Sequence, residues 1–144
     1  MPITVDSSGM PLGIITATGR LTDAEYRAHL AEVTERLLLP EGFLALAWDG
    51  VLITEMPSSC RKLQADWINA NRFAIKRKMR GIGFAFGSPF TRGLLTAVHW
   101  LSPPPYAHTV VSTRDESIRW CVDKLVRAGD LSDRAAEQLV RKSA

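Results

Sequence analysis

The chain has 144 residues, of which 46% are hydrophobic and 23% are charged, and its net charge is +3. This length and balance predict one soluble globular domain with a core of its own, and no apolar run approaches the roughly 20 residues that a membrane span needs. Residues 1–60 carry three basic and eight acidic side chains (net −5), whereas residues 61–144 carry fifteen basic and seven acidic ones (net +8).

The N-terminal third predicts a hairpin followed by a helix. β-branched residues at 3–6 and 13–19, with turn residues between them, are typical of two paired strands. Thr22 and Glu25 form a capping box in which each side chain binds the backbone amide of the other residue. The helix that follows contains His29, which has no partner at metal-ligand spacing, so we interpret it as a surface or packed imidazole.

The stretch from Phe43 to Leu63 predicts the centre of the fold. Residues 43–48 are continuously apolar and end at Asp49, which favours a strand buried on both faces. We expect a loop over residues 50–57, and then a helix to about Lys76 that Ser58 or Ser59 caps. The basic cluster at residues 76–80 then lies at a helix C-terminus, where cations oppose the dipole. Because no aromatic interleaving or nucleic-acid motif accompanies this cluster, we expect no nucleic-acid partner.

The next segment predicts a strand and a capped helix. Residues 81–87 are typical of a buried strand, and Gly81 and Gly83 indicate close packing of a helix or loop above it. Ser88 and Pro89 begin a helix as cap and first residue. The predicted core stripe of this helix consists of Phe90, Leu94, Val98 and Leu101.

The C-terminal segment predicts one more strand and two helices. The strand covers residues 107–112, and Thr113 and Glu116 form a second capping box. Gly129 ends that helix. A short helix with a thin apolar face follows within residues 130–144, and we expect this extension to add little to folding.

The predicted order is ββαβαβαβα plus the short C-terminal helix. This order indicates an α/β fold with a mixed, mostly parallel sheet of about five strands, an N-terminal β-hairpin and helices packed on the sheet. Residues 1–129 are predicted to form a single domain. The N-terminus lacks the basic region and apolar core of a signal peptide. Cys60 and Cys121 are interpreted as buried thiols rather than a disulfide, so we expect a cytoplasmic protein.

Four short phrases of the sequence carry a family resemblance. They are Gly19-Arg20-Leu21-Thr22, Ala47-Trp48-Asp49-Gly50-Val51, Ile82 to Gly87, and Ile118-Arg119-Trp120. With the predicted order, they resemble the STAS domains, the fold of the bacterial anti-sigma-factor antagonists (SpoIIAA-like). More narrowly, they resemble divergent STAS-like proteins that are also compared with CRAL-TRIO lipid-transfer domains. The resemblance covers residues 3–128 and implies binding, not catalysis.

The resemblance implies a position for phosphorylation. In the antagonists, a kinase that is also the partner phosphorylates a serine at the N-terminus of the helix after the central strand. The matching region here is residues 55–60, and it departs from the pattern because Pro57 and Ser58 stand where an aspartate precedes the serine. The candidates for partner binding or phosphorylation are Ser58, Ser59, Asp49, Glu55, Arg61 and Lys62.

Three functions stay open at this point. The first is a regulatory protein–protein interaction module in bacterial signalling, with or without phosphorylation control, whose partner is another protein such as a kinase; homo-oligomers are compatible with it. The second is a carrier or sensor of a small hydrophobic ligand or lipid. Its pocket residues would be Phe84, Phe86, Phe90 and Trp100.

The third function is an enzyme, and the sequence gives it little support. Ser88 could be paired with His99 or His108 as nucleophile and base, but the Gly-x-Ser-x-Gly elbow is missing and a helix cap explains Ser88. Asp49 and Glu55 bracket the loop after the central strand, where a loop-capping aspartate and a solvent-facing glutamate need no chemistry. We therefore predict no catalytic residue, no metal site, no cofactor and no membrane insertion.

Overall fold

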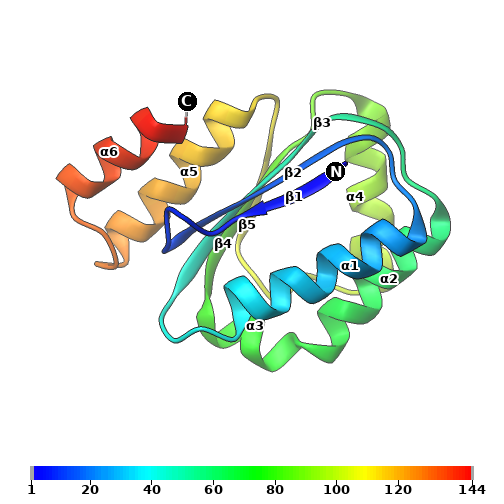
Figure 1. Cartoon of the computed structure of the whole chain (residues 1–144), viewed down its shortest axis with the longest axis horizontal. Coiled ribbons are helices and arrows are strands. Elements are labelled where there is room, and N and C mark those ends of the chain that lie inside the picture. Colours follow the sequence, from blue (N-terminus) through cyan, green and yellow to red (C-terminus); the bar gives the residue numbers. More distant parts are fainter. Residues whose placement is uncertain (1, 144) are drawn as a thin grey trace.

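The computed structural model describes residues 2–143, and its centre is a five-stranded sheet in the order β1-β2-β3-β4-β5 (Figure 1). β1 pairs antiparallel with β2, and all later pairs are parallel. The predicted mixed, mostly parallel sheet with an N-terminal hairpin is confirmed. The strands are β1 (Ile3–Asp6), β2 (Leu12–Arg20), β3 (Leu44–Glu55), β4 (Met79–Ala85) and β5 (His108–Val111).

The helices cover both faces of the sheet. From β2 to β5 each strand is placed beside the previous one in the same direction, so right-handed crossovers put all the connecting helices on one face. Only the helices after β5 remain to cover the other face, as Figure 1 shows for α5 and α6. The helices are α1 (Asp23–Val33), the π-helical turn η1 (Thr34–Leu38), α2 (Ser58–Ala70), α3 (Arg72–Lys78), α4 (Pro89–Leu101), α5 (Arg114–Arg127) and α6 (Asp133–Ser143).

β3 is the central strand, as predicted, but it is longer than predicted. Residues 44–48 are buried, whereas Phe43 is 44% exposed and lies under the guanidinium of Arg80, 3.6 Å from its ring centroid. The prediction that residue 43 is buried was therefore wrong. The predicted loop over residues 50–57 was also wrong, because β3 continues to Glu55. The last residues of β2, after a register shift, pair with this part of β3.

The predicted helix from Ser59 to Lys76 is two helices. Asn71 interrupts it with φ −113° and ψ 14°, and its side-chain amide donates to the carbonyl of Trp67 at 2.9 Å. Such local side-chain bonds compete with the helical backbone ladder. The basic residues 76–78 occupy the last turn of α3, and the Lys78 ammonium donates to the carbonyls of Leu38 and Pro40. Three of the four basic residues of the cluster therefore lie at a helix C-terminus, as interpreted from the sequence, whereas Arg80 lies in β4 and pairs with Asp130 at 2.7 Å.

Both predicted threonine caps are present, but their glutamates behave differently from the prediction. Thr22 and Thr113 accept from the amides of Glu25 and Glu116 at 3.3 and 3.2 Å. The two carboxylates accept from the threonine hydroxyls, not from the backbone amides. A hydroxyl that accepts a hydrogen bond from the N3 amide can still donate one through its own proton, and the nearby carboxylate accepts that hydrogen bond.

Leu94 and Val98 of the predicted core stripe of α4 are buried, but its two end positions are not. Phe90 and Leu101 are 55% and 58% exposed, so placing them in the core was wrong. The buried positions of α4 are Thr91, Leu94, Leu95 and Val98. Packing of α4 on the sheet and on α2 decides which of two adjacent apolar stripes faces inward, and sequence period alone does not separate them.

The glycines of β4 allow α5 to approach the sheet, as predicted. A Cβ atom on Gly81 would lie 2.6 Å from the Trp120 ring, and one on Gly83 would lie 2.9 Å from the Ser117 hydroxyl oxygen. That hydroxyl donates to the Gly83 carbonyl at 2.6 Å. The β4 backbone is thus held directly against α5.

Candidate functional site

The carboxyl ends of the parallel strands bring four connections to one end of the molecule, which we call the carboxyl edge. It consists of residues 20–23, 55–60, 86–90 and 112–114. In open α/β sheets, binding sites are found at this edge. The amide of Leu21 donates to the carbonyl of Glu55 at 3.0 Å and joins the first two connections.

Ser58 and Ser59 are exposed at this edge, but neither caps α2. Pro57 occupies the cap position without a side-chain hydrogen bond, and its carbonyl accepts from the amide of Cys60 at 3.0 Å. The predicted serine cap was wrong because the helix begins at Ser58, one residue earlier than expected. The hydroxyl of Ser59 instead donates to the Asp23 carboxylate at 2.6 Å.

Asp23 joins the first turns of α1 and α2. Besides the Ser59 hydroxyl, its carboxylate accepts from the Cys60 thiol at 3.3 Å. The hydrogen bond from Ser59, and then that from Cys60, hold the pKa of Asp23 below its usual value. Burial, together with the bond to Asp23, raises the pKa of the Cys60 thiol to about 12. Cys60 is thus a neutral donor rather than a nucleophile.

The two acidic candidates of this region lie apart and have different cationic partners. Glu55 pairs with Arg20 at 3.2 Å, and both side chains are largely exposed. Asp49 lies inside β3, where it accepts from the amide of Val51 at 3.2 Å and pairs with Arg114 at 3.2 Å, so the prediction that it caps a loop was wrong. The structure therefore does not bring Asp49 and Glu55 together.

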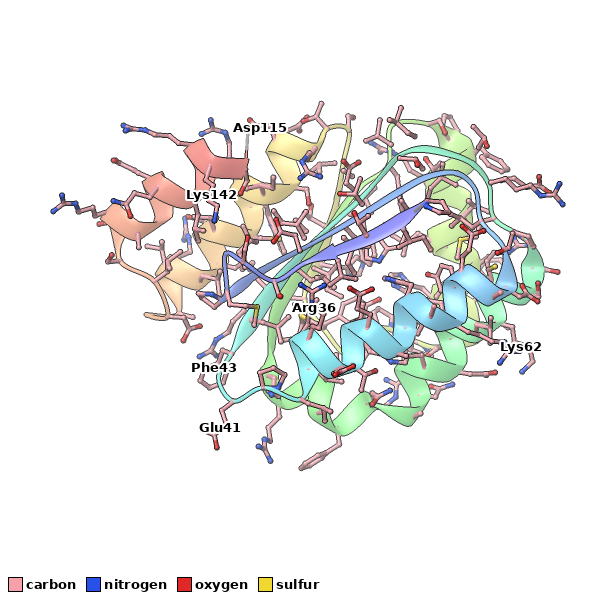
Figure 2. The ribbon with its side chains drawn as sticks, viewed as in Figure 1. Arg36, Glu41, Phe43, Lys62, Asp115 and Lys142 are labelled. Carbon is pink, nitrogen blue, oxygen red and sulfur yellow. The ribbon has the colours of Figure 1, made fainter. Side chains whose placement is uncertain are left out.

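The basic candidates lie on α2. Lys62 pairs with Asp66 at 2.9 Å in an exposed i,i+4 contact, and Figure 2 shows it on the outer side of α2, pointing away from the sheet. Arg61 is half-buried. A surface groove of about 430 Å³ lies between α2 and the end of α4. It is lined by Ser58, Ser59, Lys62, Ala65, Asp66 and Leu101.

The four aromatic candidates for a ligand pocket do not line one cavity. Phe84 and Phe86 line a cavity of about 30 Å³ between the sheet, α1, α2 and α4, which is room for about two water molecules. Phe90 and Trp100 are 55% and 85% exposed on α4. A lipid does not fit this cavity unless the helices separate.

The residues considered for nucleophile and base have structural partners. Ser88 caps α4, as predicted, by accepting from the amide of Thr91 at 3.2 Å, and the two residues form a capping box. His99 Nε2 is 2.7 Å from the Tyr106 hydroxyl, and burial lowers the pKa of His99 to about 4. Within residues 2–143, no three His, Cys, Asp or Glu side chains are grouped so that they could hold a metal ion.

Sequence analysis missed Asp23, Arg20 and Arg114 as partners of Ser59, Glu55 and Asp49. Asp23 was noticed only as part of a capping box, and Arg114 only as part of another. The contacts span 36 residues for Asp23 and Ser59 and 65 residues for Asp49 and Arg114. No local pattern reports a contact at that separation.

Comparisons with known proteins agree with the fold. No protein-family model matches the chain, and no curated protein matches it in sequence. The chain is similar in structure to an uncharacterized protein of the DUF3478 family from Shewanella loihica PV-4, which has a SpoIIAA-like fold. The TM-score is 0.56 at 11% identity, over 83% of this chain and 91% of that one. The fold is SpoIIAA-like.

The SpoIIAA-like fold agrees with the STAS resemblance of the sequence. At 11% identity the likeness concerns the fold alone. In the part of the chain that the structure describes, no helix has the length and apolar character required to cross a membrane.

Proposed function

We propose that this SpoIIAA-like chain is a non-enzymatic regulatory protein–protein interaction module whose partner docks in the groove between α2 and the end of α4. The observation that supports this most is the composition of the groove. Two exposed serines line it together with Leu101, which is 58% exposed. An exposed apolar side chain beside polar groups that can be modified suits a partner that binds and is then released.

Ser58 is the better of the two positions for control by phosphorylation. It is the first residue of α2, where free backbone amides and the helix dipole favour a phosphate. A phosphate on Ser59 would replace the hydroxyl that donates to Asp23 and place like charges together. Modification of Ser58 would therefore change the groove without opening the contact between α1 and α2.

The proposed partner is a signalling protein in the cytoplasm. The two cysteines are buried as free thiols, which is ordinary for a protein from a reducing compartment. The partner would contact an uncharged apolar wall at Leu101 and a paired Lys62 and Asp66. A groove of this composition favours an apolar anchor residue flanked by polar contacts.

The test is quantitative recovery of partners from a lysate with full-length variants. Leu101→Ser should lose the partner, whereas Leu39→Ser, which is 71% exposed at the opposite end of the sheet, should retain it. Ser58→Glu should also lose it, and Gln138→Glu on α6 controls for the added charge. Equal recovery by all four variants and the wild type would show that the groove is not the docking site.

A further inference from the structure

A separate cleft lies on the other face of the sheet, between the β1–β2 hairpin and α6. Its volume is about 290 Å³, which is at the lower end of the range for small-molecule sites. Figure 2 shows Lys142 at the end of α6 on the side of the hairpin. The cleft is lined by Asp6, Ser8, Gly9, Leu12, Ile14, Arg114, Leu139, Lys142 and Ser143.

The apolar part of the cleft comes from β2 and α6. Leu12 and Ile14 are buried side chains of the second core cluster, and Leu139 packs against that cluster from α6. Leu139 also lies close to Gly9, where a Cβ atom would be 3.0 Å from its Cδ2. The hairpin turn and α6 thus form the two walls of one cleft.

The charged part of the cleft contains both signs. The Asp6 carboxylate accepts from the amide and the hydroxyl of Ser8 at 2.8 and 2.6 Å, and these bonds hold its pKa below the usual value. Lys142 and Arg114 are the cations near it. Arg114 is fixed by its Nη1, which donates to Thr16 at 2.9 Å and to Asp49 at 3.2 Å.

We propose that this cleft binds a small zwitterion, an amino acid with an apolar side chain. Arg114 and Lys142 would hold its carboxylate, Asp6 would hold its ammonium group, and Leu12 and Leu139 would contact its side chain. The two cations face Asp6 and Asp49, so the local charges cancel. This balance favours a neutral zwitterion over a phosphate, which would be repelled by both carboxylates.

On this proposal, α6 has a binding role besides its packing on the sheet. Leu139, Lys142 and Ser143 of α6 contribute one wall, and the hairpin and Arg114 contribute the rest. Binding would therefore couple α6 to the β1–β2 hairpin. The site lies on the opposite face of the sheet from the α2–α4 groove, so it is independent of the proposed partner site.

The experiment is calorimetric titration of the full chain with three probes. L-leucine carries both charges, L-leucinamide lacks the carboxylate, and 4-methylpentanoate lacks the ammonium group. We expect saturable binding of leucine, and binding weaker by about tenfold or more for each of the other two, because each lacks one of the two charged groups that the cleft would bind. No saturable leucine binding, or equal binding of all three probes, would overturn the proposal.

Two variants with matched controls locate the site. Asp6→Asn keeps a carbonyl that can accept from Ser8 and removes the negative charge, so it should weaken leucine binding about tenfold and leave binding of 4-methylpentanoate unchanged. Lys142→Gln should weaken both ligands, and Lys76→Gln on the exposed end of α3 should weaken neither. Unchanged leucine affinity in both cleft variants would place the binding elsewhere, and melting temperatures show whether each variant is folded.

Discussion

The Ser59 hydroxyl and the Asp23 carboxylate, 36 residues apart in the chain, form a 2.6 Å hydrogen bond that joins the first turns of α2 and α1. The same carboxylate accepts from the buried Cys60 thiol. Helix starts at the carboxyl edge are therefore linked by side chains as well as by the sheet. A partner or a modification that displaces Ser59 acts on both helices.

Replacing Ser59 should reveal this link, because the resulting loss of stability should depend on pH. The bond lowers the pKa of Asp23 in the folded state, so its stabilising effect is present above the ordinary value of 3.8 and is lost as the pH falls through the lowered pKa. Ser59→Ala should lower the urea midpoint at pH 7, and this effect should shrink as the pH is lowered below 3.8. Ser58→Ala is the control, and an equal effect of both substitutions at pH 7 would deny the link.

Leu46 should be a large contributor to stability. It is 3% exposed in the central strand, so Leu46→Ala leaves a cavity and should cost about 2–5 kcal/mol in the free energy of unfolding. Leu52→Ala is the matched control, because Leu52 lies in the same strand but is 66% exposed. Urea unfolding measures both. A loss below about 1 kcal/mol for Leu46→Ala would mean that this part of β3 is not central.

Two glycines should respond to alanine in opposite directions. A Cβ on Gly83 would meet the hydroxyl oxygen of Ser117 at 2.9 Å and its carbonyl oxygen at 3.0 Å, so Gly83→Ala should cost about 1–3 kcal/mol by pushing α5 away. Gly93 lies in α4 with nothing within 4 Å of an added Cβ, and Gly93→Ala should stabilise by about 0.5–1 kcal/mol. Thermal unfolding gives the sign of the stability change for each variant. Changes of the same sign would contradict the packing described for α5.

His29 should make the protein less stable in mild acid. It is 4% exposed among the rings of Tyr26 and Trp48, and burial lowers its pKa from 6.5 to about 4. Between these values the unfolded chain binds a proton that the folded chain does not, so stability falls by about 2–3 kcal/mol as the pH drops from 6.5 to 4.

The variant His29→Leu removes this titration and should flatten the dependence of the unfolding free energy on pH in that window. Some slope remains, because the pKa of His99 is lowered in the same direction. Denaturant titrations at several pH values give the two slopes. Identical slopes for the variant and the wild type would show that His29 is accessible to protons in the folded state.

That residues 130–144 are an extension that adds little to folding stays a prediction from the sequence. Truncation after Gly129 should leave a cooperative domain of lower stability, because α6 covers Leu12 and Ile14 and its Ala136 is buried. The truncation also removes Asp130, the partner of Arg80 at 2.7 Å, so Asp130→Asn in the full chain is the control for that pair. Calorimetry would show the outcome, and a molten or insoluble product would place α6 in the core.

The sequence by itself determined the order of the five strands and the first residues of the helices that begin with a clear cap, which are α1, α4 and α5. The caps Thr22, Ser88 and Thr113 bind backbone amides within three residues. The continuous apolar run at 44–48 is typical of a central strand that is buried on both faces. Glycines in β4 likewise indicated a close neighbour, which is α5. These features depend on bonds and periods that are local in the chain, so residue type is sufficient to predict them.

Only the tertiary structure decided which distant side chains meet. The turn of α4 on the sheet places Phe90 and Trp100 in solvent, and the docking of α2 against α1 turns Ser59 toward Asp23 instead of into its own helix end. The cleft between Asp6 and Lys142 exists because α6 returns to the face of the sheet that the right-handed crossovers leave uncovered. Contacts of this kind depend on how whole helices and strands pack. If a helix turned about its axis by the angle of one residue, different side chains would face its neighbours.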